Sequence, residues 1–174
     1  MTRIHRTLLP ALILILALLL PSLSTAGQYQ VYRVVDGDTF IVKHGDVKLT
    51  IRLVGLDAPE ASTSKHRDGQ PFSRQSTQYL AGLVLNKTVD VKSYGADRNG
   101  RTLGEVFLLN GRNVNIEMIQ AGLAECYRGK PATGLDMAPY WKAEEEAKKA
   151  GRGMWQLGDK YVSPREYRRM NLPR

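Results

Sequence analysis

Asp36 and Asp38, two aspartates separated by one glycine, are the first residues in the chain whose types and spacing could do chemistry. In an extended chain, residues two positions apart project to the same side, and Gly37 allows a close backbone approach. Two carboxylates on one side can hold a hard cation, although on its own an Asp-Gly turn between strands is the simpler interpretation. The segment does not have the ligand spacing of an EF-hand loop.

A second group of charged residues lies in one short segment, residues 52–60. Arg52 is near the end of a predicted strand, and Asp57 and Glu60 lie in the following loop, which Pro59 stiffens. An outward arginine can bind phosphate oxygens, Asp57 can complete an oxygen cage, and Glu60 can orient or deprotonate a water. Each of these residues taken singly is more often just surface charge.

A third segment, residues 97–104, contains the dipeptide Asn99-Gly100, which is a strong hairpin signal. A hairpin turn here would deliver Arg101 to the start of a strand. The alternative is an ordinary solvated turn, because arginine and asparagine are common turn residues.

The elements that must position these residues are indicated by periodicity and turn residues. Strands are predicted at 31–35, 39–42, 47–53, 89–94 and 103–109, and helices at about 73–85, 114–120 and 137–150. Apolar and polar residues alternate through 47–53, so Arg52 should point away from the core. Residues 61–70 are expected to form a surface loop. This element order is compatible with an OB-type barrel and with other α+β folds.

In this order and context, the three charged segments resemble the thermonuclease, or staphylococcal-nuclease-like, family. Asp36-Gly37-Asp38-Thr39 resembles its first motif, residues 52–60 resemble its second, and Arg101 sits where the second arginine of the family follows a glycine. The resemblance continues through residues 111–127 and into Gly153-Met154-Trp155. It implies an α+β fold, a five-stranded OB-type β-barrel with three helices, which agrees with the predicted elements.

The resemblance also implies a set of site residues. The calcium ligands would be Asp38, Asp57 and the backbone carbonyl of Ala58, with Asp36 as a supporting neighbour. The catalytic residues would be Arg52 and Arg101, which bind the scissile phosphate, and Glu60, as general base or as the group that positions the water. The residues implied for substrate binding are Arg98, Asn99, Tyr127 and Tyr140.

Three of the implied substrate-binding residues either differ from the family or have a structural alternative. Some family members have a tyrosine where this chain has Asn99, so the grip on the nucleotide could differ. Tyr127 and Tyr140 could pack in the core instead of lining a nucleotide pocket.

The function implied by the resemblance is a calcium-dependent, sugar-nonspecific nuclease. It would hydrolyse DNA and RNA to 5′-hydroxyl and 3′-phosphate ends, with single or frayed strands preferred. The chain has 25 basic and 17 acidic residues, a balance that attracts phosphate backbones without proving that they bind. The alternative is a non-catalytic OB-type module that binds nucleic acid or protein. We expect a monomer.

The first 26 residues have the layout of a signal peptide: Arg3 and Arg6, then an apolar run over 8–20, then small residues ending at Ala26. Cleavage there would lower the net charge from +8 to +6 and send the protein to the periplasm or outside the cell, with no stable membrane association. An uncleaved N-terminal anchor is the alternative. Cys126 is the only cysteine, so no intramolecular disulfide can form, and we expect it to be buried.

The remaining chain divides into a nuclease domain, residues 27–158, and a basic tail, residues 159–174. The tail contains basic residues with two tyrosines between them. It could bind a nucleic-acid backbone and stack bases, or it could be a solvated tail that packs its tyrosines on the barrel. The residues concerned are Lys160, Tyr161, Arg165, Tyr167, Arg168, Arg169 and Arg174.

Overall fold

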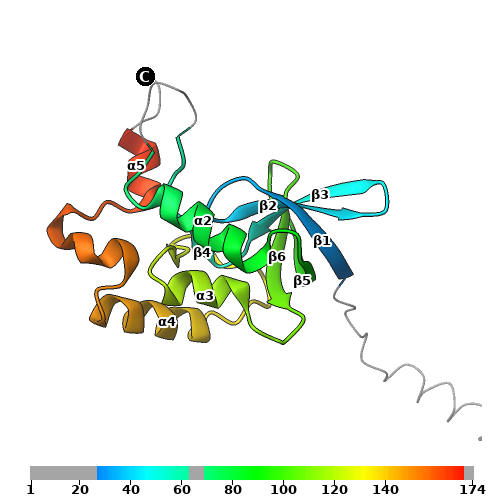
Figure 1. Ribbon diagram of the computed structural model, residues 1–174. Coiled ribbons are helices and arrows are strands. Elements are labelled where there is room, and N and C mark those ends of the chain that lie inside the picture. The colour runs from blue at the N-terminus through cyan, green and yellow to red at the C-terminus, as the bar shows by residue number, and fades with distance from the viewer. Residues whose placement is uncertain (1–26, 63–68, 171–174) are drawn as a thin grey trace, which may run out of the picture.

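The computed structural model describes residues 27–62 and 69–170, and in this part five strands close a β-barrel (Figure 1). The order around the barrel is β1-β2-β3-β6-β5. All neighbours are antiparallel except β3 and β6, which are parallel. The strands are β1 (Gly27–Val34), β2 (Thr39–His44), β3 (Val47–Leu53), β5 (Thr88–Ala96) and β6 (Thr102–Leu108). The predicted OB-type barrel of an α+β fold is confirmed.

The three predicted helices are present and pack on the barrel as a group. They are α2 (Ser73–Val84), α3 (Val114–Gln120) and α4 (Ala138–Lys149). Helix α3 contacts α2, α4 and β6, and Figure 1 places α3 and α4 side by side. Because α3 touches both other helices and the barrel, it joins the helical layer to the sheet.

Four further elements were not predicted from the sequence. A two-stranded sheet pairs β4 (Leu56–Asp57) with β7 (Glu125–Cys126), and the described part of the chain ends with the 3₁₀ helix η1 (Gly153–Lys160) and the helix α5 (Pro164–Met170). Helix α5 begins with a capping box: the amide and hydroxyl of Ser163 donate to the Glu166 carboxylate, and the Glu166 amide donates to the Ser163 hydroxyl. Part of the predicted basic tail is therefore helical.

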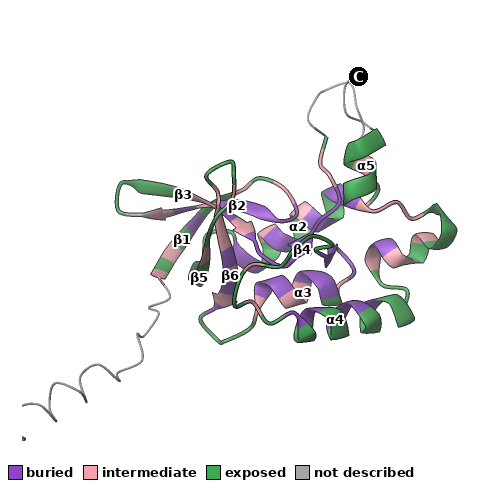
Figure 2. Ribbon diagram, turned by 180° about the vertical axis from the view of Figure 1, so that it is seen from behind, coloured by how far each residue is buried: buried purple, intermediate pink, exposed green. Residues whose placement is uncertain are grey.

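The core fills the barrel and the space between the barrel and the helices (Figure 2). Ile51 and Leu53 of β3 are buried, whereas Arg52 between them is only partly exposed and points away from the core, as the alternation predicted. The largest fully buried side chains include Phe40, Met118 and Tyr140. The side of β3 that carries Arg52 is therefore available to form a site.

A buried asparagine fixes the end of β3 relative to the helices. The Asn115 side chain, on α3, donates to the carbonyls of Val54 at 2.8 Å and Gly104 at 3.0 Å, and accepts from the Val106 amide at 3.0 Å. Since Asn115 is fully buried, these bonds are made in a low dielectric and hold their geometry firmly. They anchor the chain directly after Leu53, where the second charged segment continues.

Cys126 is buried, as predicted, and burial raises the pKa of its thiol to about 12. Within 27–62 and 69–170, no helix has the length and apolar character needed to cross a membrane. The predicted signal peptide lies outside the described residues, as does most of the predicted loop at 61–70.

Candidate active site

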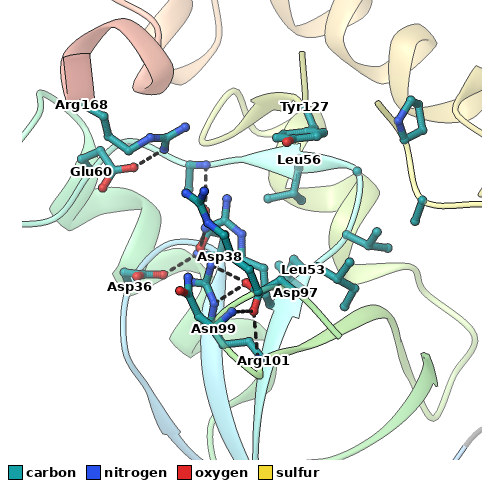
Figure 3. Close-up of a pocket in the computed structure, with 18 of the residues that line it drawn as sticks. Asp36, Asp38, Leu53, Leu56, Glu60, Asp97, Asn99, Arg101, Tyr127 and Arg168 are labelled. Atoms are coloured by element: carbon teal, nitrogen blue, oxygen red, sulfur yellow. Dashed lines mark hydrogen bonds and ion pairs between the residues drawn. The ribbon is translucent and has the colours of Figure 1, made fainter. Parts of the chain in front are cut away.

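A cavity of about 720 Å³ opens at one end of the barrel and collects most of the predicted site residues. Its walls come from the residues before β2, the end of β3 with the segment that follows it, the β5–β6 turn with the start of β6, residues 127–132 and helix α5 (Figure 3). Arg52, Ala58, Glu60 and Arg101 line it together with Asp38. Segments far apart in the sequence therefore meet at one cavity.

Arg52 joins the two aspartates that were predicted to be metal ligands. Thr39 pairs with Arg52 across β2 and β3, and this places Asp38, which precedes β2, beside the Arg52 guanidinium. Nη1 of Arg52 forms an ion pair with Oδ1 of Asp38, and Nη2 lies 2.7 Å from Oδ1 of Asp57. The Ala58 amide also donates to Oδ2 of Asp38 at 3.1 Å. The first and second charged segments thus form one cluster.

Gly37 makes this approach of the two segments possible. A Cβ at this position would lie 2.8 Å from Cβ of Ala58 and 2.1 Å from Oγ of Ser76, so any side chain would clash. Asp36 supports the same turn, because its Oδ1 accepts the Asp38 amide at 3.0 Å. Glycine between the two aspartates is therefore needed for close packing, and Asp36 stabilises the turn.

Both central carboxylates are almost inaccessible to solvent. Asp38 is 3% exposed and Asp57 is 2% exposed. Burial raises the pKa of Asp38 to about 7, and the nearby Asp36 carboxylate adds to this, although the Arg52 guanidinium opposes it. Buried carboxylates that share an arginine are a costly arrangement unless further positive charge is bound.

The β5–β6 turn holds Arg101 at another wall of the cavity. Nε and Nη2 of Arg101 lie 2.8 Å and 2.7 Å from Oδ2 of Asp97. The amides of Asn99 and Arg101 donate to Oδ1 of the same carboxylate at 2.9 Å and 3.0 Å. Burial acts to raise the pKa of Asp97, but these hydrogen bonds outweigh burial and lower it. Asp97 is thus a positioning residue that the sequence reasoning did not assign.

Arg168 is a second residue that the sequence reasoning did not place in the site. From helix α5, its Nη2 lies 2.7 Å from Oδ2 of Asp57 and its Nη1 lies 3.1 Å from Oδ1. Nη1 also forms an ion pair with Glu60, drawn in Figure 3. Hydrogen bonds to Asp57 and Glu60 raise the pKa of Arg168, against the effect of burial. From the sequence, Arg168 was predicted only to be one of the basic residues of the tail.

The residues predicted to bind substrate do not all reach the cavity. Arg98, Asn99 and Tyr127 line it, and Tyr127 is 44% exposed. Tyr140 instead lies in the core, fully buried, and its hydroxyl donates to Glu105 at 3.3 Å. Tyr140 therefore packs in the core, which was the alternative predicted for both tyrosines.

The oxygen ligands of the site fit a hard cation in their chemistry. Asp38, Asp57 and Glu60 supply carboxylate oxygens, the ligand type that calcium takes. Their arrangement in this structure does not form a metal site, because no group of three or more His, Cys, Asp or Glu side chains within the described ranges is placed to hold a metal. Both oxygens of Asp57 are instead bonded to the arginines Arg52 and Arg168.

The fold and the site together define a class: an OB-type barrel with an aspartate–arginine cluster at one end. Residues 50–157 match the family model described as staphylococcal nuclease homologue. The chain belongs to that family.

Curated relatives agree with this assignment. The chain is 38% identical over 133 residues to a protein of Escherichia coli O157:H7 named "Uncharacterized endonuclease", with 75% of this chain and 78% of that protein covered. It is 37% identical over 125 residues to "Probable endonuclease LCL3" of Komagataella phaffii, with 69% of this chain and 54% of that protein covered. The family and these relatives support a nuclease, a hydrolase, as the class of enzyme.

Proposed function

We propose that the protein is a calcium-dependent nuclease that hydrolyses phosphodiester bonds of both DNA and RNA and leaves 5′-hydroxyl and 3′-phosphate ends. The observation that carries the proposal is the buried pair Asp38 and Asp57, joined by Arg52, with Asp38 and Arg52 lining an open cavity. Buried carboxylates beside a phosphate-binding arginine are suited to metal-assisted hydrolysis of a phosphodiester.

In this proposal the calcium ligands are Asp38, Asp57 and the backbone carbonyl of Ala58. When bound, the ion would supply Lewis acidity to the phosphate and favour deprotonation of the attacking water. Arg52 and Arg101 approach the cavity from β3 and from the β5–β6 turn, so a phosphate between them would be held by two guanidinium groups. Both would neutralise charge that develops on the phosphate oxygens.

Glu60 is the proposed general base, or the residue that positions the water. Its side chain is partly exposed at the cavity wall, where a water can reach it. A carboxylate in this position can accept a proton from water as the water attacks phosphorus. Arg98, Asn99 and Tyr127 line the same cavity and would contact the nucleotides that flank the scissile bond.

Digestion of single-stranded DNA and of RNA by residues 27–174 tests the proposal. Calcium chloride is titrated from zero, with a chelator as the reference, and the product ends are identified by labelling. We expect cleavage only with calcium and 5′-hydroxyl products. Cleavage that is equally fast in chelator, or 5′-phosphate products, would overturn the mechanism.

Glu60→Gln separates a nuclease from a binding module. The variant should bind single-stranded DNA nearly as tightly as the wild type while cleaving it on the order of 100-fold more slowly. Glu145→Gln is a matched control, because Glu145 is an exposed carboxylate on α4 that pairs only with Lys149 among the described contacts. If Glu60→Gln cleaves as fast as this control, Glu60 has no catalytic role.

We also propose export through a signal peptide cleaved after Ala26, and a monomeric mature protein in the periplasm or outside the cell. Mass spectrometry of the mature N-terminus tests the cleavage, and light scattering tests the mass in solution. A membrane-bound chain that still begins at Met1 would contradict the proposed processing without affecting the proposed chemistry.

A further inference from the structure

The C-terminal segment is attached to the rest of the protein by several contacts, and some of them are in the candidate active site. The Tyr161 hydroxyl donates to Glu125 at 2.6 Å, and the Gln70 side chain donates to the Val162 carbonyl at 2.7 Å. Beyond these two anchors, α5 turns so that Arg168 reaches the Asp57 and Glu60 carboxylates. These two contacts, the anchors of the segment, would keep it attached to the protein if the Arg168 side chain moved away from the carboxylates.

Arg168 binds carboxylates of the proposed metal centre itself. It contacts both oxygens of Asp57 and one oxygen of Glu60, so a single guanidinium bridges two acidic side chains. A planar guanidinium placed in this way supplies the positive charge that a cation would otherwise supply. The C-terminal helix therefore delivers an internal positive charge to this carboxylate pair.

Asp57 cannot keep both arginines and also bind a divalent cation closely. Oδ1 already accepts from Arg52 and Arg168, and Oδ2 accepts from Arg168. A doubly charged ion on the same carboxylate would lie within a few ångströms of two guanidinium groups, and like charges that close repel strongly in a buried site. At least one arginine must move away.

Of the two arginines, Arg168 is the one that can leave. The Arg52 side chain is 17% exposed and lies on a barrel strand with neighbours on both sides, whereas the Arg168 side chain is 41% exposed on a seven-residue terminal helix. Moving Arg52 would disturb the barrel, whereas moving Arg168 would change the position of a short helix in which Pro164 is the residue that is buried. Arg168, on the C-terminal helix, is therefore held less firmly at Asp57 than Arg52 on β3.

We propose that Arg168 is an internal competitor of the calcium ion: calcium takes the place of its guanidinium on Asp57, and this exchange releases α5 from the cavity. Arg168 therefore sets the calcium concentration at which the site fills. The inference rests on the proposed calcium dependence of the nuclease. It predicts that Asp57 and Glu60 are free of the Arg168 guanidinium only after the exchange.

Calorimetric titration of residues 27–174 with calcium chloride tests the competition without using activity. Arg168→Gln should tighten calcium binding about three- to tenfold, the range expected when a partly exposed, bidentate ion pair is removed. Arg168→Lys keeps the charge but loses the bidentate contact, so its affinity should fall between those of the wild type and Arg168→Gln.

Arg169→Gln is the matched control for net charge. It removes the same charge from the same helix, but none of the described contacts joins Arg169 to the site, so its effect on calcium affinity should stay below about twofold. Circular dichroism of each variant checks that the fold is intact. If Arg168→Gln and Arg169→Gln have equal effects, only long-range charge is at work and the inference is wrong.

Hydrogen exchange of the peptide amides over residues 162–170 gives a second readout. Calcium should speed exchange in α5 of the wild type, whereas Arg168→Gln should exchange fast with or without calcium. Exchange in α5 that calcium leaves unchanged would overturn the inference. A raised KM for DNA in Arg168→Gln at unchanged calcium affinity would also overturn it, and would make Arg168 a substrate ligand. A wild type that cleaves DNA but binds no calcium would refute the proposed metal dependence and this inference together.

Discussion

Two buried clusters in this protein combine carboxylates with arginine and reach opposite electrostatic states. In one, Glu144 of α4 accepts from Arg128 at 2.6 Å and 2.8 Å, from Lys148 at 2.9 Å, and from the Cys126 amide at 2.8 Å. Burial acts to raise the pKa of Glu144, but these donors outweigh it and the pKa is lowered. One carboxylate here has two positive partners.

The candidate active-site cluster has more carboxylates than arginines. Asp38, Asp57 and Glu60 share the Arg52 and Arg168 guanidinium groups, and burial raises the pKa of Asp38 to about 7. The Glu144 cluster is thus electrostatically satisfied and joins α4 to β7, whereas the Asp38 cluster retains negative charge that a ligand can neutralise. Excess buried charge of this kind marks a functional site better than the presence of ion pairs alone.

Matched arginine-to-lysine changes should separate the two clusters most strongly. Arg52→Lys keeps the positive charge but cannot bridge Asp38 and Asp57, so the rate of DNA cleavage should fall on the order of 100- to 1,000-fold. Arg128→Lys can still pair with Glu144 and should change the rate less than about twofold. Initial rates with saturating calcium chloride measure both, and similar losses would mean that the clusters are not functionally distinct.

Glu144→Gln should have its main effect on stability. The change removes the negative charge and replaces one of the two acceptor oxygens by an amide donor that faces Arg128 and Lys148. This disruption of a buried charged hydrogen-bond network is expected to cost about 2 kcal/mol of unfolding free energy. Urea unfolding measures this cost. Glu145→Gln, on the exposed face of the same helix, should leave the unfolding midpoint nearly unchanged, and cleavage by folded Glu144→Gln should match the wild type.

The stability difference between the wild type and Glu144→Gln should depend on pH. Because the pKa of Glu144 is lowered in the folded protein, its ionised form contributes stability above the usual carboxyl pKa, and this contribution is lost as pH falls through the folded value. We expect a constant difference from pH 6 to pH 8 that shrinks below about pH 4. A difference that grows in acid would contradict the assignment.

Asp38→Asn should give the smallest effect on stability and the opposite sign. Because the folded pKa of Asp38 is raised, its ionisation costs stability as pH rises from its ordinary value toward 7. Asparagine removes that charge and leaves Arg52 paired with Asp57, so the calcium-free variant at pH 8 should gain about 1 kcal/mol. Urea unfolding in chelator tests this, and a clear loss of stability would show that Asp38 is already fully compensated.

The cluster of Asp38, Arg52 and Asp57 could be predicted because short-range rules bring it together. Alternation in β3 turns Arg52 away from the core, and the β2–β3 hairpin returns the chain beside Thr39, next to Asp38. The family resemblance then assigned the chemistry. The strands and three of the helices followed from periodicity and turn residues, and the family resemblance then implied the OB-type barrel, which the structure confirms.

What could not be predicted depends on long-range packing. Arg168 lies 111 positions from Asp57, and no local pattern indicates where a terminal helix docks. The helix itself had a signal, because Ser163 and Glu166 have the spacing of a capping box with Pro164 at the first helical position. The burial of Tyr140 in the core was not singled out from the sequence, because an aromatic residue on a helix can pack in a core or line a pocket.

The parallel pairing of β3 with β6 has a consequence for how this enzyme comes into being. The connection between the two strands includes α2 and β5, so their contact is non-local and is expected to form slowly during folding. Arg52 lies on one of these strands and Arg101 directly before the other, so the two arginines that we propose to bind phosphate come together only after the barrel closes. Nuclease activity regained during refolding is therefore a direct measure of barrel closure, and it should lag behind the recovery of helical signal.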